Sequence, residues 1–199
     1  RPGSPVREPG RSTPAVAGRA ALYGSSVIEW WTYTLGDFLM FAPRTYWRLV
    51  ELHNDALWPA QVTALLAGAV ALLALWRRVA APAVCVLLAM VWAWVGWAFH
   101  AQRYAAINWA AQGFAAAFFA EAVLWLMAAL VGVRTVSVGA KDASTTPRRA
   151  GLMLWLLALV GFPLLAPMAG RPWTQAEVFG VMPDPTVLAT LGSLLLWRD

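Results

Sequence analysis

The sequence has 199 residues, of which 60% are hydrophobic and 13% are charged, and its formal net charge is +5. An average soluble domain is roughly 45–50% apolar and about 25% charged, so a soluble globule of this length could not bury so much apolar surface. The charged residues stand between apolar runs, which excludes nucleic acid and makes lipid phosphates their expected partners.

Tryptophan and cysteine usage also fit a membrane protein. The 13 tryptophans favour a bilayer interface, where the ring meets acyl chains and the N–H meets water. The single cysteine, Cys85, lies in an apolar run, so we expect neither a disulfide framework nor a thiolate metal cluster.

The first 26 residues are rich in Pro, Gly, Ser, Ala and Arg and show no periodicity. This composition predicts a disordered tail over residues 1–26, with a non-native origin as an alternative interpretation. The tail lacks an apolar core of the length that a signal peptide needs. Because the last apolar run stops at Asp199, we also expect the chain to be a fragment of a longer protein.

Residues 27–56 have an aromatic and charged character, which predicts an amphipathic segment at the membrane surface. Pro43 suits the first turn of a helix, where its missing N–H costs nothing. Beyond it, four charged residues recur at a spacing that places them on one helical face. They are Arg44, Arg48, Glu51 and Asp55. The alternative is an ordinary amphipathic helix packed on protein.

Residues 57–199 form the predicted transmembrane domain, because they contain five apolar runs and a helix needs roughly 20 apolar residues to cross a bilayer. The runs cover residues 57–76, 79–99, part of 105–133, 150–168 and a truncated fifth run that opens at Asp184. The very short link after the first run predicts antiparallel neighbours, and Pro163 and Pro167 predict kinks. The expected fold class is an all-α, polytopic transmembrane helical bundle with an N-terminal amphipathic interfacial helix.

Small residues predict where helices approach one another closely. Ala64 with Gly68, and Gly113 with Ala117, are spaced so that each pair shares a helix face. Such pairs allow close helix packing in a membrane.

The positions of Lys and Arg predict which side of the membrane each loop faces, because cytoplasmic loops carry the basic excess. One side holds most of the basic residues: Arg77, Arg78, Arg134, Lys141, Arg148, Arg149 and Arg198. The other side holds Arg44, Arg48, Arg103 and Arg171, diluted by acidic residues. We therefore expect the interfacial helix to face outward.

Three long segments of the chain resemble a known family. They read EWWTYTLGDFLMFAPRTYWRLVELHNDALWPAQ, WAWVGWAFHAQRYAAINWAAQ and FPLLAPMAGRPWTQAEVFGVMPDPTVLATLG. In this order they resemble the bacterial multi-pass membrane proteins catalogued as domain of unknown function 6064, over residues 27–196. The resemblance implies a multi-pass protein of the bacterial inner membrane, and it brings no activity, substrate or catalytic residue.

Polar and aromatic residues, including both histidines, gather on the predicted outer side in the segments HND, HAQRYAAINW and RPWTQAE. We predict that they form a binding vestibule at the outer end of the helices. Its residues are His53, Asp55, His100, Arg103, Tyr104, Asn108, Arg171, Trp173 and Glu177. Arg103 or Arg171 would hold an anionic group. The alternative is an interfacial belt of Trp, Tyr and Arg that anchors the helices.

Glu121 is a candidate intramembrane ionisable site, because it stands near the middle of a predicted span. A charge there costs at least about 2.5 kcal/mol and should face the bundle interior or a water cavity. One interpretation is a proton or cation site. The other is a protonated carboxyl hydrogen-bonded to a neighbouring helix.

Three classes of function stay open. The first is a membrane protein that handles or senses a small solute at the vestibule. The second is a non-catalytic accessory or structural protein that docks lipid or a partner subunit, and the third is a membrane-embedded enzyme. The sequence lacks a metal-ligand spacing, a nucleophile elbow and a redox cysteine pair, so we predict no catalytic residue, metal or cofactor.

Overall fold

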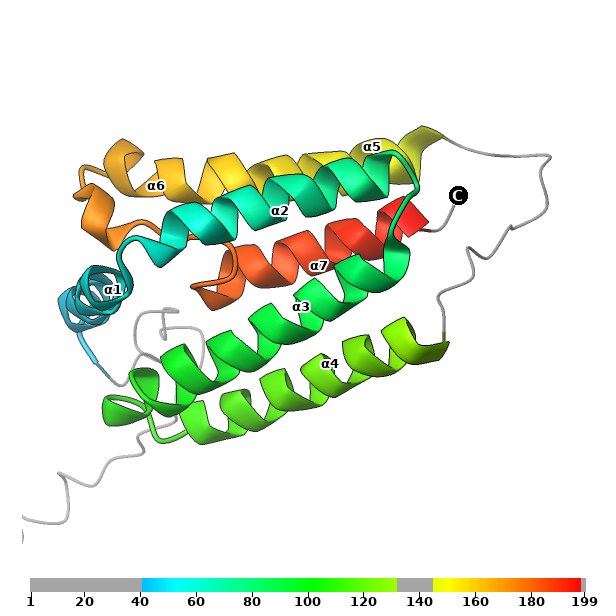
Figure 1. The fold of residues 1–199 in the computed structure, drawn as a ribbon. Helices are drawn as coiled ribbons and strands as arrows, with labels where there is room; N and C mark the ends of the chain where they lie inside the picture. The colour runs from blue at the N-terminus through cyan, green and yellow to red at the C-terminus, as the bar shows by residue number, and fades with distance from the viewer. Residues whose placement is uncertain (1–40, 132–144, 198–199) are drawn as a thin grey trace, which may run out of the picture. The chain divides into compact units, whose positions relative to one another are not determined.

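The computed structural model describes residues 41–131 and 145–197, and all regular elements within them are helical (Figure 1). The α-helices are α1 (Pro43–Leu57), α2 (Ala60–Trp76), α3 (Ala81–Val95), α4 (Ala111–Val131), α5 (Thr145–Leu156), α6 (Phe162–Met168) and α7 (Pro183–Trp197). The shorter elements are the π turns η5 (Gly96–Ala101) and η7 (Leu157–Gly161) and the 3-10 turns η6 (Tyr104–Ala106) and η8 (Trp173–Gln175). The all-α fold class is confirmed over these residues. The predicted tail and residues 27–40 of the predicted interfacial segment lie outside them.

Among residues 41–131 and 145–197, three helical stretches are long and apolar enough to cross a membrane: Ala81–Ala106, Ala111–Val131 and Thr146–Met168. A fourth span is added only if α1 and α2 count together as one bent span. These stretches support the predicted membrane location. Helix α7 has 15 residues, fewer than the roughly 20 that a bilayer crossing needs, so the fifth span stays a prediction.

The first predicted span, residues 57–76, is broken near its start. Helix α1 extends to Leu57, α2 begins at Ala60, and the two are bent by 86°. Pro59 explains the break, because it has no N–H to donate and it favours the extended backbone that Trp58 adopts. Helix α1 therefore lies nearly perpendicular to α2, which is the direction that an interfacial helix takes relative to a spanning helix.

The predicted disturbance at Pro163 takes the form of a π turn. A proline clashes with the carbonyl of the residue four positions earlier and removes one helical hydrogen bond. The wider turn η7 ends just before Pro163 and relieves this conflict. As a result, Thr146–Met168 continues as one candidate span through both of its inner prolines.

Helix α7 packs between α3 and α5 and joins them through a row of buried hydroxyl groups. Thr190 and Ser193 donate to the α7 carbonyls one turn earlier, at 2.9 Å each. Each hydroxyl also accepts an indole N–H, from Trp92 of α3 at 2.8 Å and from Trp155 of α5 at 3.2 Å. Hydrogen bonds of this kind fix helix positions in a membrane, where hydrophobic association between helices is weak.

Glycines let three of the helices approach closely. A Cβ on Gly151 of α5 would lie 2.8 Å from the carbonyl oxygen of Gly192 on α7. A Cβ on Gly68 of α2 would lie 2.6 Å from a side-chain carbon of Leu159, which agrees with the predicted packing role of Gly68. A Cβ on Gly113 would meet no atom of the described residues within 4 Å, so close packing at Gly113 stays a prediction.

The two ends of the bundle differ in composition. One end contains the link between α2 and α3 and the start of α5, with Arg77, Arg78, Arg148 and Arg149 (Figure 1). There Arg148 donates to the Trp76 carbonyl oxygen at 2.9 Å and lies 4.2 Å from the centroid of the Trp76 ring, which closes the exposed end of α2. The other end is made by α1, η5, η6, η8 and the first turn of α7, and we call it the polar end.

Candidate functional site

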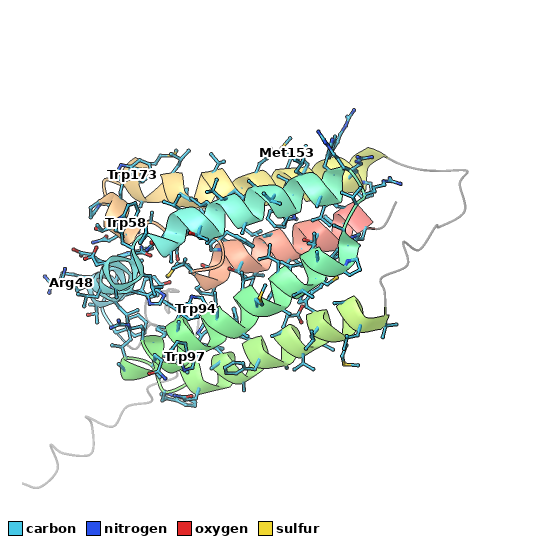
Figure 2. The ribbon with its side chains drawn as sticks, viewed as in Figure 1. Arg48, Trp58, Trp94, Trp97, Met153 and Trp173 are labelled. Carbon is cyan, nitrogen blue, oxygen red and sulfur yellow. The ribbon has the colours of Figure 1, made fainter. Side chains whose placement is uncertain are left out.

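The residues of the predicted vestibule lie at the polar end. Figure 2 shows Arg48, Trp58 and Trp173 at this end and Met153 toward the other. The vestibule residues come from α1, from η5 and the stretch that leads from it to α4, and from the segment that leads into α7. Their side chains do not line one common chamber, because they are divided between several cavities and a buried network.

The buried network centres on Glu177, which is 8% exposed. The hydroxyl of Tyr46 on α1 donates to Oε1 of Glu177 at 3.3 Å. Burial raises the pKa of the Glu177 carboxyl and the charge of Asp184 raises it further, while the hydrogen bond from Tyr46 and the charge of Arg171 lower it. The Glu177 carboxyl is therefore more readily protonated in the folded protein than it would be in water.

The segment around η8 is attached to α1 by further polar contacts. Asn54 of α1 donates its side-chain N–H groups to the carbonyl oxygens of Thr174 and Ala176, both at 2.8 Å. Arg171 stacks over the ring of Trp47 and donates to the Gln175 carbonyl oxygen at 3.3 Å. Arg171, predicted to hold an anion, is thus engaged in joining two segments of the fold.

The two histidines both lie against one aromatic ring, that of Phe99. The centroid of Phe99 is 5.5 Å from that of His53 and 5.3 Å from that of His100. Both histidines are buried, at 2% and 5% exposure. Within the described residues, Nε2 of His53 and both ring nitrogens of His100 have no hydrogen-bond partner.

A cavity of about 300 Å³, which we call the histidine cavity, lies beside His100. Its wall is mostly aromatic and includes one carboxylate. It is lined by Tyr46, Phe99, His100, Tyr104, Phe114, Ala117, Phe118, Pro183, Asp184 and Val187. The structure therefore unites His100 and Tyr104 of the predicted vestibule with residues from α1, α4 and α7.

Sequence reasoning did not assign Tyr46, Phe118 or Asp184 to the site. Tyr46 falls in the predicted interfacial segment 27–56, and Asp184 was expected only as the opening of the fifth apolar run. Phe118 stands in an apolar run with nothing to distinguish it from lipid-facing neighbours. None of the three carried a signal strong enough to place it beside His100.

A second cavity, of about 630 Å³, lies between α1 and the stretch that follows η5. We call it the arginine cavity, because three guanidinium groups line it. The lining residues are Arg44, Thr45, Arg48, Leu49, Leu52, Gln102, Arg103, Ala106 and Ile107. Of the predicted anion-holding residues, Arg103 lies here.

The other predicted vestibule residues lie elsewhere. Asp55 and Trp173 line a cavity of about 350 Å³ at the corner between α1 and α2, and His53 lines one of about 410 Å³ together with Arg103. Asn108 accepts a hydrogen bond from the backbone N–H of Ala110 at 2.9 Å, which shapes the turn before α4. Asn108 therefore has a local structural role.

Glu121 lies in α4 and is half-buried. Helix α4 packs chiefly against α3, at one side of the bundle (Figure 1). Within the described residues Glu121 makes no hydrogen bond and no ion pair, so the role of a coupling group stays a prediction. The expected carboxyl hydrogen bond to a neighbouring helix is not observed among these residues.

No group of three or more His, Cys, Asp or Glu side chains in the described ranges could hold a metal ion. Over residues 41–131 and 145–197, no hydrogen bond joins any two of His53, His100, Arg103 and Glu177.

Comparison with known proteins gives one match. The model of a family described as "Family of unknown function (DUF6064)" matches residues 43–199, which include every cavity described above. No curated protein and no solved structure matches the chain.

Proposed function

We propose that this chain, which belongs to the DUF6064 family of unknown function, is an integral membrane protein that binds a small organic ammonium ion in the histidine cavity. Binding of a small solute at the polar end is the first of the three functions expected from the sequence. The histidine cavity supports it and narrows the class of solute. The bacterial inner membrane, with the polar end outward, is the location that we propose.

The observation that carries the proposal is the state of the His100 ring. A neutral imidazole has one N–H donor and one acceptor nitrogen. Both nitrogens of His100 are buried without a protein partner among the described residues. Each unsatisfied buried polar group costs roughly 1–3 kcal/mol, so a solute that meets the ring would recover free energy.

The position of His100 within its helix also favours a binding role. His100 lies in the π turn η5, and π turns occur frequently at functional sites. A Cβ on Gly96, at the start of this turn, would lie 2.9 Å from the Cβ of Phe118. Gly96 therefore allows η5 to approach α4 closely enough for the His100 and Phe118 rings to meet, with centroids 4.6 Å apart.

The walls of the cavity favour a cation. Aromatic faces attract ammonium groups, and several aromatic rings together can form a cage around such a cation. Tyr104 and Phe114 are stacked with centroids 6.5 Å apart, and both line the cavity. Asp184 supplies a carboxylate at the same wall, and Glu177 lies close enough for their charges to interact. The volume of about 300 Å³ suits a small molecule.

The test measures thermal unfolding of the detergent-solubilised protein by tryptophan fluorescence, with ethylammonium as the probe and ethanol as its uncharged counterpart. We expect ethylammonium to raise the unfolding temperature and ethanol to leave it unchanged. His100→Phe and Asp184→Asn should abolish the rise. His53→Phe is the matched control, because His53 is the other buried histidine against Phe99 but does not line the histidine cavity, and this variant should keep the rise.

Two outcomes would overturn the proposal. If ethanol stabilises the protein as strongly as ethylammonium, the cavity does not select a cation. If the rise with ethylammonium persists in both His100→Phe and Asp184→Asn, the cation binds elsewhere.

The accessory function remains the second candidate, and one observation favours it. Four tryptophans at the polar end are strongly exposed: Trp58 at 70%, Trp97 at 50%, Trp109 at 80% and Trp173 at 61%. Exposed tryptophans at one end of a helical bundle suit a belt that anchors it at the bilayer interface. Such a belt is compatible with a cavity that binds a solute, so the exposed tryptophans do not separate the two candidates. The ammonium experiment separates them.

A further inference from the structure

We infer that the arginine cavity binds the phosphate headgroup of an anionic phospholipid, with an acyl chain running past Leu52 toward Trp97. This site is distinct from the histidine cavity; it rests on the membrane location in the proposed function and not on the binding of an ammonium ion. It assigns a ligand to the part of the polar end that holds three of the basic residues.

The charge of the cavity is the first argument. Arg44 and Arg48 lie one turn apart on α1, and Arg103 reaches the same cavity from the stretch after η5. Arg48 is neutralised by Glu51, whose carboxylate is 2.8 Å away. Arg44 and Arg103 have no ion-pair partner within the described residues, so the cavity keeps an excess of positive charge.

The chemistry of the guanidinium group points to phosphate. It presents a planar set of N–H donors that matches phosphate oxygens in a bidentate manner. Its positive charge also complements the negative charge of a phosphate. A carboxylate would also satisfy these donors, but the anion that a membrane surface supplies is the lipid phosphate.

The apolar part of the wall favours a lipid. Leu49, Leu52 and Ile107 contribute aliphatic surface beside the arginines, and the Leu52 side chain is 46% exposed. A free anion needs only the guanidinium groups and gains nothing from this surface. A phospholipid uses both, because its phosphate meets the arginines while its glycerol and upper acyl carbons cover the aliphatic side chains.

The neighbouring cavity provides a route for the acyl chain. The cavity of about 410 Å³ shares Gln102 and Arg103 with the arginine cavity, so the two adjoin at these residues. Its wall contains Trp94 and Trp97, which belong to the candidate span Ala81–Ala106. Figure 2 shows both tryptophans on the bundle beside the region of α1. An acyl chain that leaves the headgroup site would therefore run along the aromatic surface of this candidate span.

The experiment is native mass spectrometry of the detergent-solubilised full chain titrated with phosphatidylglycerol or phosphatidylcholine, two lipids that differ in headgroup charge. The test variant combines Arg44→Gln, Arg48→Gln and Arg103→Gln. The control combines Arg77→Gln, Arg78→Gln and Arg149→Gln, which makes the same charge change at the other end. Circular dichroism and size-exclusion chromatography monitor folding, and Arg103→Gln alone serves if the triple variant misfolds.

We expect the wild type to bind phosphatidylglycerol in preference to phosphatidylcholine. The test variant should bind phosphatidylglycerol on the order of 100-fold more weakly, since each basic residue near a membrane surface contributes about a fivefold factor. The Arg103→Gln variant should lose about fivefold. The control variant should bind as the wild type does, and inorganic phosphate should not displace the lipid.

Three results would overturn the inference. An equal loss in the test and control variants would mean that the lipid responds to net charge alone. Displacement by inorganic phosphate would identify a free-anion site. Equal binding of the two lipids by the wild type would show that the arginines do not select a headgroup.

Discussion

Arg171 lies over the face of the Trp47 ring, with 3.4 Å between the guanidinium carbon and the ring centroid. This contact connects the segment before η8 to α1, two parts of the chain that are far apart in sequence. A cation over an indole ring contributes from about 0.5 to about 2 kcal/mol, depending on how far it is desolvated. Arg171 is half-buried, so the contact should matter for the stability of the polar end.

Replacing Arg171 should therefore destabilise the fold. We expect Arg171→Gln to lower the free energy of unfolding by about 1–2 kcal/mol, because it removes the cation from Trp47 and weakens the bond to the Gln175 carbonyl. Denaturant unfolding in detergent micelles, followed by tryptophan fluorescence, measures the change. The control is Arg149→Gln, an exposed arginine at the other end. Equal small effects from both variants would mean that Arg171 is a peripheral residue.

The Glu177 carboxyl should make stability depend on pH. Its folded-state pKa lies above its ordinary value of 4.5, because burial and the charge of Asp184 oppose ionisation. The stability that it contributes is therefore fully present below the unfolded-state pKa and is lost as pH rises through the raised folded-state pKa. The Glu177→Gln side chain keeps an oxygen that can accept the hydrogen bond from Tyr46, but it has no group that can ionise.

We expect Glu177→Gln to stabilise the protein relative to the wild type at about pH 8, and the two proteins to converge near about pH 4. The unfolding temperatures of both proteins across this pH range give the measurement. If the unfolding temperatures of the two proteins change in parallel with pH, Glu177 does not ionise within this pH range.

The hydrogen bond from Trp92 to Thr190 should couple α3 to α7. We expect Trp92→Phe and Thr190→Val to be less than additive, with a coupling free energy of about 0.6 and at most about 1.7 kcal/mol. A double-mutant cycle of detergent unfolding free energies measures it. A coupling of zero would indicate that the indole N–H finds another acceptor when Thr190 is removed.

The approach of α5 to α7 should be sensitive to a single methyl group. Gly151→Ala would place a Cβ 2.8 Å from the backbone oxygen of Gly192, which cannot move aside as a flexible side chain could. We expect a destabilisation of roughly 1–3 kcal/mol, as is typical of overpacked sites. Chemical unfolding of the purified variants measures it.

Gly113→Ala is the matched control, because the new methyl group meets no atom within 4 Å in the part of the chain that the structure describes. Alanine favours a helix over glycine by up to about 1 kcal/mol, so this variant should be neutral or more stable. Equal destabilisation at both positions would rule out a specific clash at Gly151.

The positions of the helices could be read from the sequence because they depend on local properties. Apolar runs of sufficient length predicted α3, α4 and the α5–α6 stretch, and Pro43 and Arg77 marked the start of α1 and the end of α2. The predicted boundary between the interfacial segment and the first span, at residues 56–57, lies close to the break at Pro59 between α1 and α2. Hydropathy indicates such a boundary but not the angle by which the backbone changes direction there.

The gathering of polar residues at one end also followed from the sequence, because alternating spans return every second loop to the same side. Their division between cavities did not follow. Whether His100 meets Asp184, and whether Arg103 meets Arg44, depends on how α1, α4 and α7 pack on α3, and close packing between helices depends on side-chain shapes that no periodicity encodes. The sequence by itself therefore determined the lipid-compatible helices and their polar end, whereas only tertiary packing decided which side chains share a cavity there.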